Sequence, residues 1–126
     1  MRNIKVHEFD SVRIETIIFS FNNLSIKYLI HLSTFSNLFN GTISLLEGLK
    51  LNYQLNVITN GFEVVQHHKI KNSGLANYFK NIITAEKVGY KKPNPIIFEY
   101  ALDQTKTTPE NSLMIGDSLE ADILGA

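Results

Sequence analysis

The alternation of short apolar strands with helices, from Asn40 to the end of the chain, most constrains the fold. Leu55–Thr59 (LNVIT) is a β-branched run that stops at a turn, and Ile82–Thr84 is a second short run. A third run, Ser112–Ile115, again stops at a turn. Strands separated by helical patterns predict a parallel sheet with covering helices, so we expect an α/β fold.

Helical patterns with one apolar face lie between these strands and after the last one. The predicted helices are Thr42–Lys50, Glu63–Ser73, a segment from the cap Asn94 and Pro95 to an exit near Pro109, and Leu119–Gly125. The residues expected to face inward are Ile43, Leu46 and Leu49, then Val64, Val65 and Ile70, and then Ile97, Phe98 and Ala101. Gly74 is placed to end the second helix.

The composition excludes several classes of protein. With 126 residues, 44% of them hydrophobic, and a formal net charge of zero, the chain lacks the basic excess of a nucleic-acid binder. It has no cysteine, so a disulfide framework and a thiolate metal site are both excluded. No apolar stretch approaches the roughly 20 residues of a membrane span, so we expect no membrane partner. The absence of cysteine and the polar start Met1–Asp10 favour the cytoplasm.

Polar residues follow two of the predicted strands, where ligands of open parallel sheets bind. Thr59-Asn60-Gly61 offers a hydroxyl and turn amides to an anion, or is a plain turn. Asp117 and Asp122 are suited to Mg²⁺, or are helix-cap acids. Lys92, before Pro93, is a phosphate ligand or a surface lysine. The adjacent His67 and His68 point in different directions on a helix, so a shared metal is not expected.

Three segments in this order, LNVITNGF, VGYKKPNPIIFEYAL and SLMIGDSLEADILGA, resemble motifs two, three and four of the haloacid dehalogenase superfamily. The stretch YLIHLSTFSNLFNGTISLLEGLK followed by ITNGFEVVQHHKIKNSGL is most similar to its pyrimidine 5′-nucleotidase branch. The resemblance implies a three-layer, Rossmann-like parallel sheet. It also implies Mg²⁺-dependent hydrolysis of a phosphate monoester, a nucleotide or small phosphometabolite, through an aspartyl-phosphate.

The resemblance also implies roles for individual residues. Thr59 and Lys92 would be the catalytic residues of these segments, because the hydroxyl would bind the phosphate and the ammonium would bridge phosphate and nucleophile. The implied phosphate contacts are Thr59, Asn60, Gly61 and Lys92, and the implied metal ligands are Asp117 and Asp122, the latter directly or through water.

The first motif of that superfamily, an Asp-x-Asp at a strand end, does not occur upstream of Thr59. Residues 1–40 are therefore either a remnant of a helical cap or a decayed first motif, and residues 41–126 are an incomplete core, truncated at its C-terminus. In the decayed motif, Ser20 and Asn22 of IIFSFNNL would replace the two aspartates, and neither is suited to their work. A third interpretation makes Ile14–Phe21 simply a buried strand or helix.

Both family interpretations predict little or no turnover by this chain. In the superfamily the first strand is central, so its loss would leave two apolar edges facing a gap. Either Ile14–Phe21 fills that gap or the isolated chain is unstable. The alternative to an enzyme is a non-catalytic remnant that binds phosphate and Mg²⁺, or a subunit completed by a partner chain that supplies the missing strand.

Overall fold

The computed structural model describes residues 27–29, 31, 34 and 36–126. The chain divides into two units, Met1–Leu32 and Ser33–Ala126. In the first unit only Lys27–Leu29 and His31 are described, and these residues are helical. The second unit holds all the strands and helices discussed below.

The predictions about the start of the chain fall on residues that the structure does not describe. These are Ile14–Phe21 and the two positions Ser20 and Asn22. Whether residues 1–40 are a cap remnant or a decayed first motif therefore stays a prediction.

The sheet of the second unit has two strands within the described residues, β1 (Leu55–Thr59) and β2 (Phe79–Thr84), which pair in parallel. β2 begins three residues earlier than the sequence predicted. The register places Thr59 opposite Thr84 at the carboxyl ends of the strands. Because the strands are parallel, the loops that follow them leave from the same edge of the sheet, as a ligand site requires.

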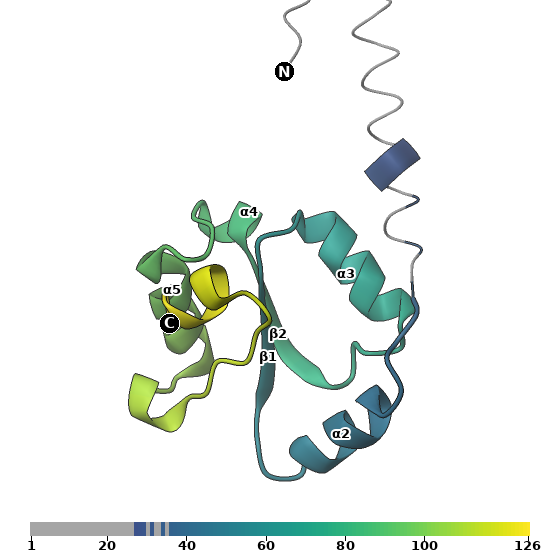
Figure 1. The fold of residues 1–126 in the computed structure, drawn as a ribbon, viewed down its shortest axis with the longest axis horizontal. Coiled ribbons are helices and arrows are strands. Elements are labelled where there is room, and N and C mark those ends of the chain that lie inside the picture. Colours follow the sequence, from purple (N-terminus) through teal and green to yellow (C-terminus); the bar gives the residue numbers. More distant parts are fainter. Residues whose placement is uncertain (1–26, 30, 32–33, 35) are drawn as a thin grey trace, which may run out of the picture. The chain divides into compact units, whose positions relative to one another are not determined.

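Helices cover both sides of these strands, with α5 on one side and α3 on the other (Figure 1). The elements are α2 (Thr42–Leu49), α3 (Glu63–Asn72), α4 (Ala85–Val88), α5 (Pro95–Thr105), the 3₁₀ turn η1 (Pro109–Asn111) and the π-helix η2 (Leu119–Ile123). The layered α/β class predicted from the sequence is confirmed.

Local signals in the sequence account for the ends of two helices. The side chain of Asn94 caps α5 by accepting a hydrogen bond of 3.0 Å from the amide after Pro95. Gly74 adopts a φ of 71° just beyond α3, and the Leu75 amide donates to the Ile70 carbonyl at 2.9 Å. This Schellman-type ending requires the left-handed conformation that glycine adopts without strain.

The largest apolar cluster lies between the sheet and α5. Ile97, in the first turn of α5, is fully buried, and Ile58 and Met114 pack against the cluster. The buried members are Ile83, Ala85, Ile97, Phe98 and Ala101. The predicted inward face of α5 is therefore confirmed. Because burial of apolar area stabilises a fold by about 25 cal/mol per Å², this cluster stabilises the packing of α5 against the sheet.

Several further sequence predictions are corrected by the structure. Val64 is not inward but 68% exposed, while its neighbour Val65 is buried. Ser112–Ile115 forms no strand, because no neighbouring strand pairs with it within the described residues. α5 ends at Thr105, before the expected exit near Pro109, and the predicted helix Leu119–Gly125 is only the five-residue η2.

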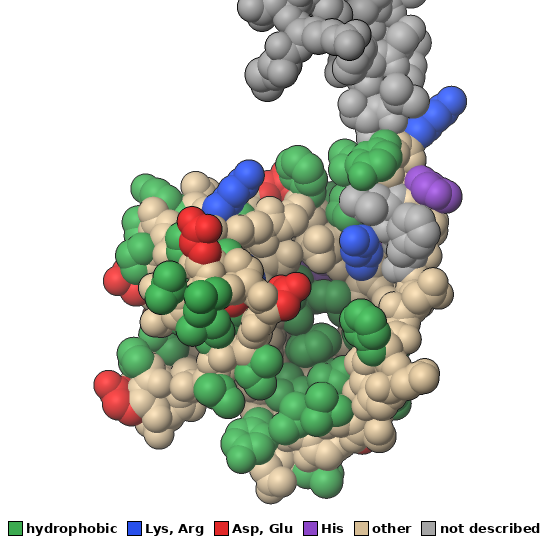
Figure 2. Space-filling view, in the orientation of Figure 1, with side chains coloured by type: hydrophobic (Ala, Val, Ile, Leu, Met, Phe, Trp, Pro, Cys, Tyr) green, Lys and Arg blue, Asp and Glu red, His purple; other side chains and the backbone are tan. Residues whose placement is uncertain are grey.

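The predicted inward face of α2 is only partly buried. Leu46 and Leu49 are half-buried, whereas Ile43 is 42% exposed, and no residue of α2 is fully buried. Figure 2 shows hydrophobic side chains gathered over α2 and the adjoining part of the sheet. The exposed hydrophobic residues of this region include Leu45, Leu51 and Tyr53.

Within the described part of the chain, no helix is long and apolar enough to cross a bilayer.

Ile97→Ala should lower the free energy of unfolding by about 3 kcal/mol, because it removes a fully buried side chain from the cluster. The matched control is Ile96→Ala on the same helix, which should cost below about 1 kcal/mol because Ile96 is 38% exposed. Urea unfolding followed by circular dichroism measures both. Equal losses in the two variants would contradict the placement of α5.

Candidate functional site

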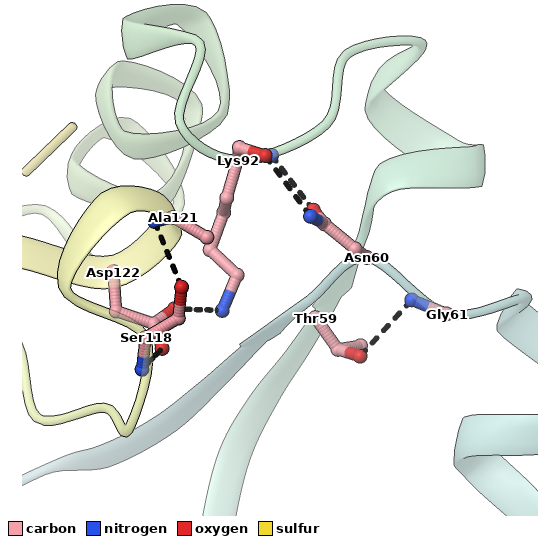
Figure 3. A network of polar contacts seen from close by, with 7 residues as sticks. All are labelled: Thr59, Asn60, Gly61, Lys92, Ser118, Ala121 and Asp122. Atoms are coloured by element: carbon pink, nitrogen blue, oxygen red, sulfur yellow. Dashed lines mark hydrogen bonds and ion pairs between the residues drawn. The ribbon is translucent and has the colours of Figure 1, made fainter.

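The turn that follows β1 presents a hydroxyl in a fixed orientation. The Gly61 amide donates a hydrogen bond of 3.1 Å to Oγ1 of Thr59, so the hydroxyl of Thr59 is turned toward its own turn (Figure 3). Within the described residues this hydroxyl donates no hydrogen bond, and its own proton remains available. A hydroxyl that accepts from an amide and has a free proton is suited to donate to an anionic oxygen.

The side chain of Asn60 ties this turn to the loop before α5. Its Nδ2 donates to the Lys92 carbonyl at 3.0 Å, and its Oδ1 accepts from the Lys92 amide at 2.7 Å. One side chain thus satisfies both backbone groups of Lys92, whose peptide bond to Pro93 is cis. The contact joins residues 32 positions apart and fixes the backbone of Lys92 at the end of β1.

Lys92 forms an ion pair with Asp122. Its side chain runs from the loop toward η2, where Nζ meets Oδ1 of Asp122 (Figure 3). The two side chains are only 12% and 6% exposed. Little water screens such a pair, and loss of either partner would leave the other charge buried.

The second oxygen of Asp122 is also engaged, since Oδ2 accepts from the Ser118 amide at 3.1 Å. Ser118 in turn caps η2, because its Oγ accepts from the Ala121 amide at 3.0 Å. Gly116 lies so close to the Asp122 carboxylate that any side chain at this position would overlap it. Asp122 is therefore held by groups on three sides.

These contacts explain the electrostatics of Asp122. The hydrogen bond from the Lys92 ammonium holds the pKa of the Asp122 carboxyl below its ordinary value, and the backbone amides of Ser118 and Asp117 add to that effect against the opposing effect of burial. Asp122 is therefore ionised in the folded protein at neutral pH.

Asp117 differs from Asp122 in its surroundings. Its side chain is exposed and has no hydrogen-bond or ion-pair partner within the described residues. Mg²⁺ is commonly held by one or two carboxylates together with water and substrate phosphate oxygens. Asp117 fits a direct ligand of such an ion, whereas Asp122 has both oxygens occupied and fits a supporting position.

The structure brings several of the predicted site residues together. Asn60, Lys92 and Asp122 are joined by direct contacts, and Thr59 lies in the same turn as Asn60. Nε2 of His67 lies 3.9 Å from Oε1 of Glu63. No group of three or more His, Asp or Glu side chains that could hold a metal ion occurs in the part of the chain that the structure describes. The roles of the site residues stay predictions.

Sequence reasoning missed two contributors to this site. Only the backbone of Asn60 was expected to take part in the site. Its side-chain contact with Lys92 was missed, because a contact across 32 positions leaves no local pattern in the sequence. Ser118 had a readable signal, since a serine directly before an acidic helical turn is a typical N-cap.

With this geometry in place, comparison with known proteins identifies the family. A family model described as haloacid dehalogenase-like hydrolase matches residues 2–126. The chain belongs to the haloacid dehalogenase-like hydrolase family. The resemblance inferred from the three sequence segments is confirmed.

Curated relatives carry names of phosphate-ester hydrolases. A pyrimidine 5′-nucleotidase of Escherichia coli is 44% identical over 87 residues, which are 68% of this chain and 38% of that protein. A glyceraldehyde 3-phosphate phosphatase of Methanothermobacter thermautotrophicus is 39% identical over 87 residues, 69% of this chain and 38% of that protein. The chain thus spans about two fifths of the length of these relatives, and the first of them supports the resemblance to the nucleotidase branch.

A solved structure supports the fold of this family member. The crystal structure of a haloacid dehalogenase-type hydrolase of Bacillus subtilis bound to magnesium is 33% identical, with a TM-score of 0.71. The match covers 82% of this chain and 47% of that chain. The α/β core described above is therefore part of the family's architecture.

Asp122→Asn should lower the free energy of unfolding by about 3 kcal/mol at pH 7, because Lys92 loses its buried counter-charge. The pKa of Asp122 is depressed in the folded state, so its contribution is present above the unfolded pKa of about 3.9 and is lost as pH falls through the folded value. The stability difference between wild type and variant should therefore narrow below about pH 4.

Urea unfolding at pH 7 and pH 3 measures this difference. The control is Asp103→Asn, which removes an exposed partner of Lys106 and should cost at most about 0.5 kcal/mol. A difference between wild type and Asp122→Asn that stays constant with pH would show that the ion pair does not stabilise the fold.

Asn60→Ala should free the backbone of Lys92. A hydrogen bond is worth about 1 kcal/mol, so the Lys92 amide should exchange with solvent about fivefold faster. Hydrogen exchange followed by NMR measures the rate. Asn52→Ala, on the exposed turn after α2, is the matched control and should leave the Lys92 amide unchanged. Equal exchange in all three proteins would contradict the contact.

Proposed function

We propose that this chain carries the phosphate- and Mg²⁺-binding half of a phosphate-monoester hydrolase site. The observation that carries the proposal is the joining of the β1 turn, Lys92 and Asp122 at the carboxyl edge of the sheet. Loops at this edge are where ligands of parallel sheets bind. The relatives named above act on a nucleotide and on a triose phosphate by their names, and a phosphate monoester is what these substrates share.

The phosphate would be held by groups that are already oriented. Thr59 offers a hydroxyl proton, and Lys92 has two N–H groups beyond the one directed at Asp122. The Gly61 amide holds the Thr59 hydroxyl, Asn60 holds the backbone of Lys92, and Asp122 holds the Lys92 ammonium. Donors fixed before the anion arrives need no costly reorganisation, so they stabilise charge on a transferring phosphoryl group effectively.

The charges of the site favour binding of a cation first and of an anion only after it. Asp122 neutralises Lys92, and the carboxylate of Asp117 stays uncompensated within the described residues. A phosphate dianion placed here alone would be repelled by Asp117. Mg²⁺, when bound, supplies the positive charge that neutralises the phosphate oxygens. Asp117 would hold the ion, and Asp122 would keep Lys92 and the Ser118 backbone in place.

We also propose that the 126-residue chain by itself binds phosphate without hydrolysing its esters. No Asp-x-Asp occurs upstream of Thr59. Ser20 and Asn22, which would stand in place of the two aspartates in a decayed first motif, are poor nucleophiles without a neighbouring base. The proposed substrate class is a nucleotide or another small phosphometabolite. The cytoplasm is the proposed compartment, because the chain contains no cysteine.

Mg²⁺ should raise the stability of the chain, by roughly 1.4 kcal/mol at ten times its dissociation constant. Orthophosphate should bind only when Mg²⁺ is present. Asp117→Asn should abolish both effects, and Glu120→Gln, an exposed neighbour, should leave both unchanged. Thermal unfolding and isothermal titration calorimetry measure these effects.

Turnover tests the second part of the proposal. The chain should not hydrolyse p-nitrophenyl phosphate or pyrimidine mononucleotides with Mg²⁺. Hydrolysis that Asp117→Asn abolishes and Glu120→Gln preserves would overturn the claim of incompetence. Absence of Mg²⁺-dependent phosphate binding in the wild type would overturn the proposal as a whole.

A second candidate is a subunit completed by a partner chain. β1 pairs only with β2 among the described strands, so its other edge has no neighbour there. Leu113 and Ile115 are 84% and 76% exposed in a segment that the sequence predicted as a strand. Unpaired strand edges bind strands of other chains. This candidate predicts the same phosphate binding, with turnover only in a complex that contributes the carboxylates.

A further inference from the structure

A carboxylate from α4 holds the start of α3. The backbone amide of Glu63, the first residue of α3, donates a hydrogen bond of 2.7 Å to Oε2 of Glu86. The residue before the helix, Phe62, provides no side-chain cap. Glu86 therefore replaces the missing local cap from 23 positions further along the chain.

Glu86 is itself placed by the end of β2. Thr84 is fully buried, and its Oγ1 accepts a hydrogen bond of 3.2 Å from the Lys87 amide, which starts α4 directly after the strand. Thr84 is also the register partner of Thr59 on β1. The two strand ends are thus linked twice, through the sheet and through the contact between Glu86 and α3.

We propose that Glu86 is a positioning residue for the phosphate-binding turn Thr59–Gly61. The carboxylate fixes the first turn of α3, and that turn begins two residues after Gly61. The Gly61 amide donates to the Thr59 hydroxyl at 3.1 Å, so a displacement of this amide would disturb the hydrogen bond that orients the hydroxyl. This inference rests on the proposed function, because it assigns Glu86 to the same phosphate site.

The geometry favours positioning over competition with the ligand. Glu86 accepts from the amide of Glu63, while the Gly61 amide is already directed at Thr59, so the carboxylate leaves the donors of the turn in place. A negative group at a helix N-terminus also stabilises the helix through its dipole. Without Glu86, the first turn of α3 would have a free amide and would fray, and the turn before it would lose its anchor.

The test compares Glu86→Ala and Glu86→Gln in the 126-residue chain, with Glu99→Ala as a matched control. Glu99 is exposed on α5, and its side chain forms no hydrogen bond or ion pair within the described residues. Orthophosphate affinity in the presence of Mg²⁺ is measured by calorimetry at a temperature where every variant is folded. Amide exchange at Gly61 and Glu63 is measured by NMR without ligand.

Glu86→Ala should bind orthophosphate about tenfold more weakly, the effect of losing one hydrogen bond to a charged group. Glu86→Gln keeps an acceptor oxygen and should bind within about twofold of wild type. Exchange at Gly61 and Glu63 should be faster in Glu86→Ala alone. A purely structural role would lower the melting temperature of Glu86→Ala without changing affinity in the folded protein, and that result would overturn the inference.

Two further outcomes are decisive. Tighter phosphate binding by Glu86→Ala would mean that the carboxylate competes with the ligand, which also overturns the inference. If wild type binds no phosphate, the proposed function fails, and the assignment of Glu86 to a phosphate site fails with it. If wild type binds orthophosphate and Glu86→Ala binds it with the same affinity as Glu99→Ala, only the inference about Glu86 fails.

Discussion

The parallel pairing of β1 with β2 is the constraint from which the site follows. It places Thr59 beside Thr84, so the turn after β1 and the α4 segment after β2 leave the sheet at one edge. Lys92 lies only a few residues beyond α4, within reach of the β1 turn. An antiparallel pair would send these two loops to opposite ends of the sheet, and no change of side chain would bring them together.

Side chains that bind backbone groups connect the loops at this edge. Asn60 binds both backbone groups of Lys92, Glu86 binds the first amide of α3, and Asp122 binds the Ser118 amide. Each contact satisfies a polar group that a loop or a helix end leaves unpaired. The same contacts fix the directions of the groups proposed to bind phosphate. Stability and site geometry therefore depend on the same hydrogen bonds, and a change at one of them should affect both.

The sequence predicted what depends on local chemistry and missed what depends on distant partners. α5 begins and α3 ends close to where the sequence predicted, because Asn94, Pro95 and Gly74 act on their own neighbours. Ser112–Ile115 has the composition of a strand, yet a strand also needs a paired neighbour, and the described residues supply none. Val64 and Val65 were both predicted to face inward from the helical pattern of apolar residues, but only Val65 is buried. The side-chain contacts of Asn60 and Glu86 join residues 32 and 23 positions apart, and no local pattern encodes them.

Asp117 and Asp122 show why two nearby carboxylates need not share a role. Both come from one short segment, and the sequence assigned both to the metal. Asp122 is buried, paired with Lys92 and bonded to the Ser118 amide, so its charge is already compensated by the protein. Asp117 is exposed without such a partner in the described residues, so its charge is the one left for an ion from solution. A cation stabilises an uncompensated carboxylate more than one that is already compensated by the protein. Burial and pairing therefore give Asp117 and Asp122 different roles.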